Sequence, residues 1–338
     1  MAVITNPYTG KKYADLDAQG VMNLAQQVVE QYFIGAAITS KYPSFERSIS
    51  EYGGILGRVR FPAVTSIAVD PNTMTKIAPA YPNPDALYFC KWQRKRYPVE
   101  WDELDVQKVV NGEMKFNEFI ARAINAAVEG YQLDKNRDIK NAFMKQGTPS
   151  GADDNAAIWV GADGTVSTDA QSFLGHLGHY EKLEDGVTFQ EVYQVLQDIS
   201  KDMTYDNSTY TDAFVCGAEI PDLRIVVPHK FMSGANTAYL AQLVQLQKAE
   251  KLPEIVETDG CIFTANGKTY CVALIMDKDF MFHCERARMT LAGHDRDRGS
   301  FYNDLIVEDG IPVFPSMKAY AVIFQLPTQG TTGELVNA

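Results

Sequence analysis

Hydrophobic residues recur every three to four positions in several stretches of the chain, and this spacing predicts helices. The first stretch covers residues 17–34, and the longest, residues 113–146, contains no proline. A third helix is predicted to begin at Thr188, because Thr188 and Glu191 have the spacing of a capping box. Residues 235–248 show the same periodicity. The pattern therefore predicts helices in both halves of the chain.

A second pattern, of alternating or continuous apolar residues, predicts strands, mostly in the last quarter of the chain. The Asn-Gly dipeptide at 266–267 is preferred in two-residue hairpin turns, and such a turn pairs Ile262 with Cys271. Cys261 and Cys271 then point to opposite faces, so we expect no disulfide between them. Residues 318–326 are apolar on both faces, which indicates the centre of a sheet. The other predicted strands cover residues 223–228, 254–264, 269–276, 280–292 and 300–308.

Two extended segments, residues 55–68 and 86–97, have the pattern of the two arms of a long hairpin. In the first arm, arginines alternate with Val59 and Phe61. At the end of the second arm, KWQRKRY (91–97) places lysines and arginines on both faces. A ribbon that is polar on both sides is unstable alone and prone to associate at its edges. We therefore expect a neighbouring molecule to cover it.

The composition narrows the class of protein. A chain of 338 residues, 46% of them hydrophobic, buries a sizeable core and suggests about two domains. No apolar run approaches the roughly 20 residues of a membrane helix, so we expect a soluble cytosolic product with no membrane contact. The five cysteines form no CxxC pair, which favours reduced thiols. The net charge of −12 argues against a protein that grips DNA, although an acidic protein can enclose nucleic acid.

The segment HCERARMTLAGHDRDRG, residues 283–299, combines possible metal ligands with arginines and aspartates. Strand alternation places His283 and Glu285 on one face, where they could share a metal ion if a third ligand came from elsewhere. The opposite face takes Cys284, Arg286 and Arg288. The end of the segment, GHDRDRG, has the composition of a solvated turn whose alternating charges suit a contact with another molecule. We therefore favour a charged strand and turn over a metal site.

Three other motifs are weaker candidates for chemistry. His176 and His179 lie three residues apart, but glycines flank them and no HExxH arrangement is present, which favours a surface loop. GADDN (151–155) and GADGT (161–165) lack the ligand spacing of a calcium loop and have the composition of turns. KWQRKRY (91–97) could bind nucleic acid, but an ion-pairing surface for another subunit suits an acidic chain better. With no nucleotide-binding or nucleophile motif in the sequence, we expect no catalytic residue, metal or cofactor.

Three segments carry a resemblance to a known family: GRVRFP (57–62), YCVALIMDKDFMFHCERARMTL (270–291) and SFYNDLIVEDGIPVFPSMKAYAVIF (300–324). These segments and the order of predicted elements resemble the major capsid proteins of tailed bacteriophages, which have the Hong Kong 97-like fold. The resemblance implies an α+β fold with an N-arm, an E-loop hairpin, a spine helix, a peripheral domain and an axial domain. The implied parts are the N-arm and its helix (1–52), the E-loop (53–104), the peripheral-domain spine helix (105–148), the axial domain (149–275), the peripheral-domain sheet (276–326) and a mobile tail (327–338).

The resemblance also implies a function. The chain is expected to self-assemble, as hexamers and pentamers, into the icosahedral head that encloses viral double-stranded DNA without sequence-specific binding. Its expected location is the virion, after assembly in the host cytoplasm. Because the chain begins almost directly at the arm helix, we expect a separate scaffolding protein, or a sequence already trimmed, and a portal is a further expected partner.

Two other functions stay open at this point. An encapsulin-like compartment has the same fold but stores an enzyme, and the acidic balance favours the DNA container only slightly. A metal-dependent enzyme would use His176, His179, His283, Glu285 and His294. For a shell, the candidates for contacts between subunits are the charged residues of the ribbon and of the late strand, namely Arg58, Arg60, Lys91, Arg94, Lys95, Arg96, Arg286, Arg288, Asp295, Arg296, Asp297 and Arg298.

Overall fold

The computed structural model divides the chain into two compact units. Unit 1 comprises Met1–Gly54, Lys91–Arg137 and His283–Gly310, and unit 2 comprises Ile55–Cys90, Asp138–Phe282 and Ile311–Ala338. The residues that the structure describes are 4–5, 12–13, 40–48, 56–60, 85–89, 91–102, 116–151, 154–205, 209–210, 219–234, 253–295 and 300–327.

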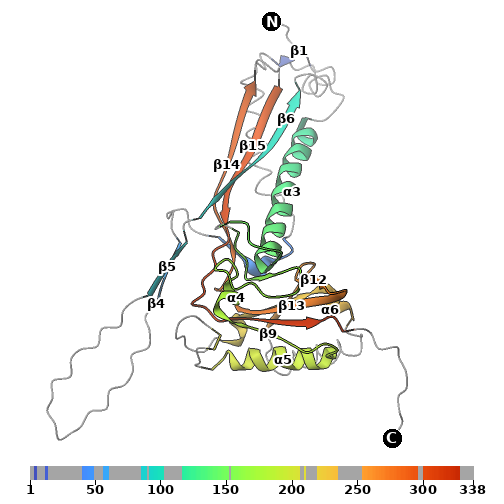
Figure 1. The fold of residues 1–338 in the computed structure, drawn as a ribbon. Coiled ribbons are helices and arrows are strands. Elements are labelled where there is room, and N and C mark those ends of the chain that lie inside the picture. The colour runs from blue at the N-terminus through green and yellow to red at the C-terminus, as the bar shows by residue number, and fades with distance from the viewer. Residues whose placement is uncertain are drawn as a thin grey trace, which may run out of the picture. The chain divides into compact units, whose positions relative to one another are not determined.

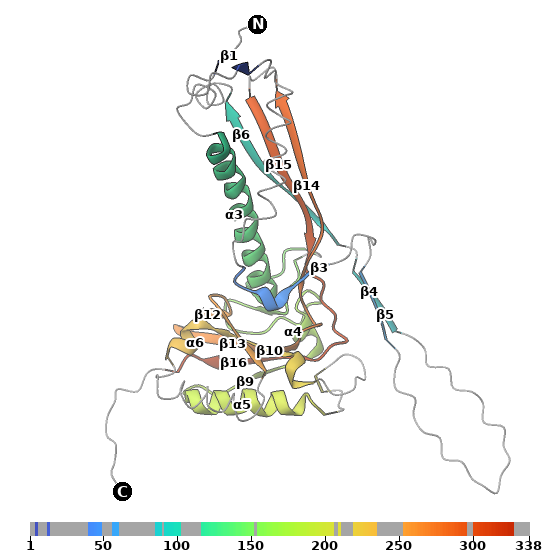
Figure 2. The same ribbon diagram turned by 180° about the vertical axis from the view of Figure 1, so that it is seen from behind.

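Unit 1 is built on a four-stranded sheet with the order β3-β14-β15-β6, and a long helix, α3, lies along it (Figures 1 and 2). The sheet pairs β14 with β15 and β15 with β6 in antiparallel fashion, whereas the short β3 runs parallel to β14. The helix predicted over 113–146 is confirmed. The bounds are Glu46–Ser48 for β3, Gln93–Asp102 for β6, Phe116–Phe143 for α3, His283–Asp295 for β14 and Ser300–Gly310 for β15.

Unit 2 contains a mixed sheet with the order β11-β10-β13-β16-β9, to which β12 adds by pairing with β13. The prediction that residues 318–326 form a central strand is confirmed, because β16 lies between β13 and β9 and residues 321–324 are fully buried. The predicted strand 223–228 is also confirmed. The bounds are Tyr180–Lys182 for β9, Leu223–Pro228 for β10, Glu254–Thr258 for β11, Ile262–Ala265 for β12, Lys268–Asp277 for β13 and Ala319–Gln325 for β16.

Helix α5 (Phe189–Asp202) covers one face of this sheet (Figures 1 and 2). Its start is the predicted capping box: the Thr188 hydroxyl accepts from the backbone N–H of Glu191, and the Glu191 carboxylate accepts from the backbone N–H of Thr188. The helix then buries one stripe, Val192, Leu196, Ile199 and Met203, in the core that β10, β13 and β16 supply. The capping box and the spacing of the apolar residues thus both favour this helix.

The hairpin of β12 and β13 turns at Asn266 and Gly267, whose φ angles are 52° and 74°. A type I′ turn needs positive φ at both positions, which asparagine and glycine tolerate best. The turn pairs Ile262 with Cys271, as predicted, and both Cys261 and Cys271 are free and buried. The dipeptide therefore fixed the register of the hairpin.

The remaining elements are short. They are β1 (Ile4–Thr5), β2 (Lys12–Tyr13), β4 (Leu56–Arg60), β5 (Asp85–Phe89), β7 (Met144–Gln146), β8 (Ile158–Val160), α4 (Phe173–Leu177), α6 (His229–Gly234) and the 3-10 turns Pro43–Phe45 and Ile220–Asp222. The predicted helices 17–34 and 235–248 lie outside the described residues. Among the described helices, none combines the length and the apolar composition that a membrane crossing requires.

Two expectations differ from the structure. The ribbon pairs β4 with β5 as predicted, but residues 93–97, expected at the end of its second arm, belong to β6 and pair with β15. A local pattern cannot reveal that a strand changes partner within a few residues. The single sheet segment expected at 276–326 is also divided, because β14 and β15 belong to unit 1 whereas β16 pairs with β13 and β9 in unit 2.

Candidate subunit interface

The charged residues singled out from the sequence are concentrated on the sheet of unit 1, whose two faces differ. Strand pairing places Lys95 beside Val307 and Arg96 beside Ile306, so alternate residues of β6 share a face with alternate residues of β15. The Tyr97 ring contacts the Tyr131 ring of α3 at a centroid distance of 5.9 Å, which identifies the helix-side face. We call the opposite one the outer sheet face; it carries Arg94, Arg96, Arg286, Met289, Leu291, Asp304, Ile306 and Glu308.

On the helix-side face, Lys95 belongs to a buried polar group within the subunit. Its Nζ donates to Oδ2 of Asp309 at 2.9 Å, and Nε2 of His283 lies 3.2 Å from the same oxygen. Burial alone would raise the pKa of Asp309, but the contacts with His283 and Lys95 outweigh it and hold the pKa below its usual value. Lys95 thus has an internal partner, and the structure gives it no exposed role.

Arg288 is also engaged within the subunit. Its Nε and Nη2 donate to the two carboxylate oxygens of Glu285, each at 2.7 Å, and its guanidinium lies 5.4 Å from the centroid of the Tyr131 ring. Burial, with the adjacent Glu285 carboxylate, raises the pKa of Tyr131. The Tyr131 hydroxyl therefore stays protonated and available as a donor to that carboxylate.

The strand alternation predicted for residues 283–291 holds as far as Arg286 and is wrong from Ala287 on. The register between β14 and β15 shifts between Glu285 and Ala287, so Arg286 is the extra residue of a β-bulge. A bulge reverses the alternation that follows it. It places Arg288 on the same face as Glu285, whereas Met289 and Leu291 lie on the outer sheet face.

The arginines of the outer sheet face contact carboxylates of β15. Arg96 binds Oδ2 of Asp304 at 2.6 Å. Arg94 and Arg286 each approach Glu308, at 3.9 and 3.7 Å, and Arg286 also lies over the Trp92 ring. The side chains of Arg94 and Arg96 are mostly exposed. Of the predicted contact residues with described side chains, these three arginines share the outer sheet face, and Arg286 is 39% exposed.

The other predicted contact residues are only partly described. Lys91 is exposed and precedes β6, and Asp295 ends β14. Arg58 and Arg60 lie on β4, opposite Leu87 and Asp85. The side chains of Arg58, Arg60 and Asp295, and the whole of Arg296, Asp297 and Arg298, lie outside the described residues.

The residues of the metal-enzyme alternative fall in two units. His176, in α4, and His179 belong to unit 2, and Nδ1 of His176 lies 3.0 Å from the carbonyl oxygen of Thr168. His283, Glu285 and His294 belong to unit 1, where Glu285 is held by Arg288. In the part of the chain that the structure describes, no three histidine, cysteine or acidic side chains cluster closely enough to hold a metal ion.

Sequence reasoning missed the carboxylates that organise this sheet. Asp304 and Asp309 lie on β15, on opposite faces, because their separation of five residues is odd. Each binds a cation of β6, Arg96 or Lys95, that lies on the same face, two positions along the strand from its direct register partner. The sequence carries a signal for this pairing, because a strand with acidic residues on both faces suits a strand with basic residues on both faces. The charge pattern alone does not show that β6 and β15 are neighbours.

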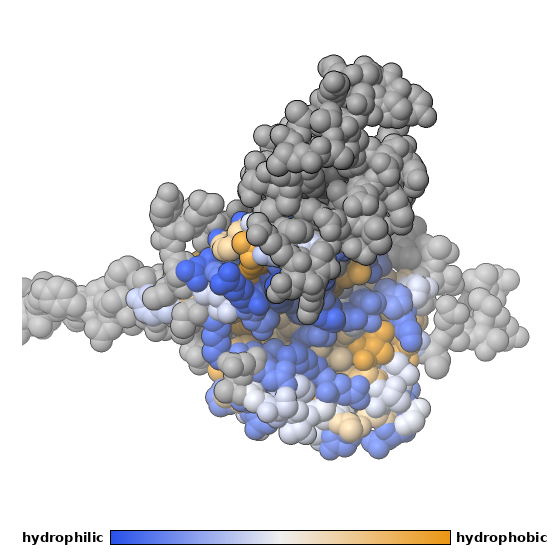
Figure 3. Space-filling model, turned by 90° about the horizontal axis from the view of Figure 1, so that it is seen from above, coloured by the Kyte–Doolittle hydropathy of each residue, from blue (hydrophilic) through white to orange (hydrophobic). Residues whose placement is uncertain are grey.

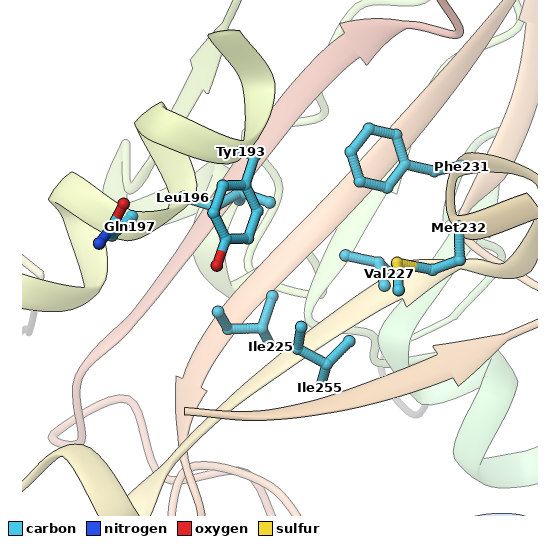
Figure 4. Close-up of a pocket in the computed structure, with 8 residues that line it drawn as sticks. All are labelled: Tyr193, Leu196, Gln197, Ile225, Val227, Phe231, Met232 and Ile255. Carbon is cyan, nitrogen blue, oxygen red and sulfur yellow. The ribbon is translucent and has the colours of Figure 1, made fainter. Parts of the chain in front are cut away.

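Unit 2 has a groove that, unlike the outer sheet face of unit 1, carries no charged side chain. It lies between α5, α6, β10 and β11 (Figure 4) and is lined by Tyr193, Leu196, Gln197, Ile225, Val227, Phe231, Met232 and Ile255. None of these side chains is charged, so the groove supplies no acid, base or ion-binding group. In the view of Figure 3, hydrophilic residues cover most of the visible described surface, and hydrophobic residues form smaller groups between them.

Comparison with known proteins adds a family. The model of the family described as Phi29-like phage major capsid protein matches residues 17–306. No curated protein sequence matches the chain.

Solved structures resemble this chain in fold. A chain of the capsid structure of Staphylococcus phage Andhra is 9% identical, with a TM-score of 0.54 and coverage of 85% of this chain and 84% of that one. A chain from the structure of the head fiber and inner core protein gp22 of bacteriophage P68 is 8% identical, with a TM-score of 0.54 and 85% coverage of both chains. A chain of the capsid of Ralstonia phage GP4 is 9% identical, with a TM-score of 0.50 and coverage of 87% and 90%. At such identities the likeness concerns the fold alone.

Proposed function

The chain belongs to the family of Phi29-like phage major capsid proteins, and we propose that its copies assemble, as pentamers and hexamers, into an icosahedral head that encloses double-stranded DNA. A major capsid protein forms the shell of the phage head, so a structural role in the virion follows from the family. What we propose beyond the family is the icosahedral symmetry of the shell, its assembly from pentamers and hexamers, and its content of double-stranded DNA.

The ribbon of β4 and β5 is the observation that carries the proposal. It pairs five residues of each strand, from Leu56 opposite Phe89 to Arg60 opposite Asp85, and no other described strand joins it. A two-stranded ribbon is marginally stable in water and gains stability when another surface covers it. In a shell, neighbouring copies supply such surfaces, and many modest contacts add to a strong total.

The proposed domain assignment follows the two units. Unit 1, with α3 as the spine helix, would be the peripheral domain of a Hong Kong 97-like fold, and unit 2 would be the axial domain. The ribbon would form the base of the E-loop, and residues 1–52 the N-arm. The order of elements and the likeness to the capsid chain of phage Andhra support this assignment.

The proposed partners are other copies of the chain, a separate scaffolding protein and a portal, with assembly in the host cytoplasm. The net charge of −12 supports enclosure of DNA without tight binding, because like charges repel. Lys95 and Arg288 bind their partners on the helix-side face of the sheet, so we restrict the described contact candidates to Lys91, Arg94, Arg96 and Arg286.

Nuclease protection tests the contents of the shell. Particles formed in cells that express the chain with its phage partners are isolated on a gradient, treated with nuclease and analysed for nucleic acid and protein. Protected double-stranded DNA is the expected result. Particles that hold one co-purifying enzyme and no nucleic acid would instead support the encapsulin-like compartment and contradict the proposal.

A further inference from the structure

The outer sheet face brings exposed apolar and cationic side chains together in a small area. Met289 is 42% exposed and pairs with Ile306, which in turn pairs with Arg96. Leu291 is 51% exposed and lies two residues further along the same face of β14. Two large apolar side chains that are exposed next to each other and flanked by charged groups are typical of a protein–protein contact rather than of a surface that contacts solvent only.

Arg96 is held in a fixed position on this face. Its Nε and Nη2 both bind Oδ2 of Asp304, whereas its side chain remains 62% exposed. Asp304 is fully buried, and its Oδ1 has no hydrogen-bond partner in the described structure. The remaining N–H groups of the guanidinium therefore stay available while the group itself is anchored. Such an anchored fork loses little entropy when it binds a second carboxylate.

The charge of the face decides what kind of partner fits it. Arg94 and Arg96 are exposed and Arg286 is partly exposed, and the described carboxylates that they approach are those of Asp304 and Glu308. If the same face of a second copy met this one, the arginines would oppose one another, and juxtaposed like charges disfavour a contact. A second copy carries a net charge of −12, so its other surfaces are rich in carboxylates.

We infer that the outer sheet face binds a different, acidic surface of a second copy of this chain. The inference rests on the proposed function and deepens it, because it specifies that the contact is heterologous. Contacts between unlike surfaces repeat from copy to copy and form a ring when the rotation closes, whereas contacts between like surfaces stop at pairs. A heterologous contact therefore suits the five- and six-membered rings of the proposed shell.

Substitution of the apolar pair tests whether the face is used. The double variant Met289→Thr, Leu291→Thr keeps strand-forming side chains and should unfold like the unaltered chain, but it should reduce the yield of shells about tenfold or more. The matched control is Leu133→Gln, which changes an apolar side chain of the same unit that is 69% exposed on α3. This control should assemble normally.

Charge reversal provides a second variant that leaves the fold intact. Arg94→Glu changes a side chain that is 60% exposed and whose described carboxylate contact, with Glu308, is long at 3.9 Å. The variant should therefore fold, and it should also reduce assembly. Shells at normal yield from both the double variant and Arg94→Glu would overturn this inference and leave the proposed function unaffected. Absence of shells from the unaltered chain under all conditions would contradict the proposed function as well.

Photo-crosslinking identifies the partner surface. Met289→p-benzoylphenylalanine is assembled from an equal mixture of isotopically heavy and light chains, irradiated and mapped by mass spectrometry. We expect heavy–light crosslinks from position 289 to a segment that contains aspartate or glutamate and lies outside the outer sheet face. Crosslinks between the outer sheet faces of two copies, or crosslinks confined to one chain, would refute the heterologous contact.

Discussion

The hydroxyl group of Tyr131 on α3 donates a 2.9 Å hydrogen bond to Oε2 of Glu285 on β14. Arg288 binds both oxygens of the same carboxylate and places its guanidinium over the Tyr131 ring. The three side chains form a closed set in which each contacts the other two. Helix α3 is therefore fixed on its sheet by polar contacts as well as by apolar packing.

Tyr131→Phe tests this set. The substitution removes a hydrogen bond to a charged acceptor and should lower the free energy of unfolding by about 2 kcal/mol. Urea unfolding of the unassembled chain measures the change. Tyr88→Phe is the matched control, because Tyr88 is mostly exposed, and it should have no measurable effect. Equal stability of the two variants would mean that the bond contributes nothing.

Asp309→Asn should make stability depend less on pH. Asp309 has a lowered pKa in the folded chain, so its ionised form stabilises the fold above the unfolded value of about 3.9, and this contribution is lost as pH falls through the folded pKa. At pH 7 the variant leaves Lys95 and His283 without the negative charge of their carboxylate partner and should cost about 3 kcal/mol. The difference from the unaltered chain should shrink below about pH 4.

Urea unfolding between pH 3 and pH 7 measures this difference, at values about one unit apart. Asp198→Asn, at an exposed position of α5, serves as the control. A difference that stays constant over the whole range would show that Asp309 does not act through its charge.

Lys318→Met should destabilise unit 2. The side chain is buried, and its Nζ donates to the carbonyl oxygens of Met203 and Tyr205, just beyond the end of α5. A cation at this end of a helix also interacts favourably with the helix dipole. The loss should be about 3 kcal/mol, since two carbonyl groups lose their donor. In a thermal melt the variant should unfold earlier than Lys230→Met, a change at an exposed lysine, and identical melting of the two would contradict this role.

Gly175→Ala should be poorly tolerated in α4. An added Cβ would lie 2.0 Å from the carbonyl oxygen of Ser167, so the backbone would have to move. Such overpacking costs about 1 to 3 kcal/mol. At Gly151 no atom lies within 4 Å of the added Cβ, and Gly151→Ala should be neutral or slightly stabilising. Thermal melts that rank the two variants in the opposite order would show that the close approach at Gly175 is relieved without cost.

Local signals in the sequence predicted the elements whose determinants are themselves local. The Asn-Gly turn at 266–267 fixed the β12–β13 register, and the Thr188–Glu191 capping box fixed the start of α5. In both cases the contacts that decide the structure lie within a few residues along the chain. Periodicity likewise placed α3 and the central strand β16.

The features that escaped prediction depend on distant residues. The partner of β6 is β15, about two hundred positions later, and no nearby residue shows this pairing. The bulge at Arg286 reversed the faces of Arg288 and Met289, so that Arg288 lies on the helix-side face and Met289 on the outer sheet face. The candidate interface therefore required the strand register, because a list of charged residues does not show which of them share a face.

Electron microscopy of particles from cells that express the unaltered chain with its phage partners tests the central claim most directly. The account predicts closed shells of icosahedral symmetry, built from five- and six-membered rings of this chain. One small oligomer under every assembly condition, with stoichiometric zinc or iron bound, would contradict it.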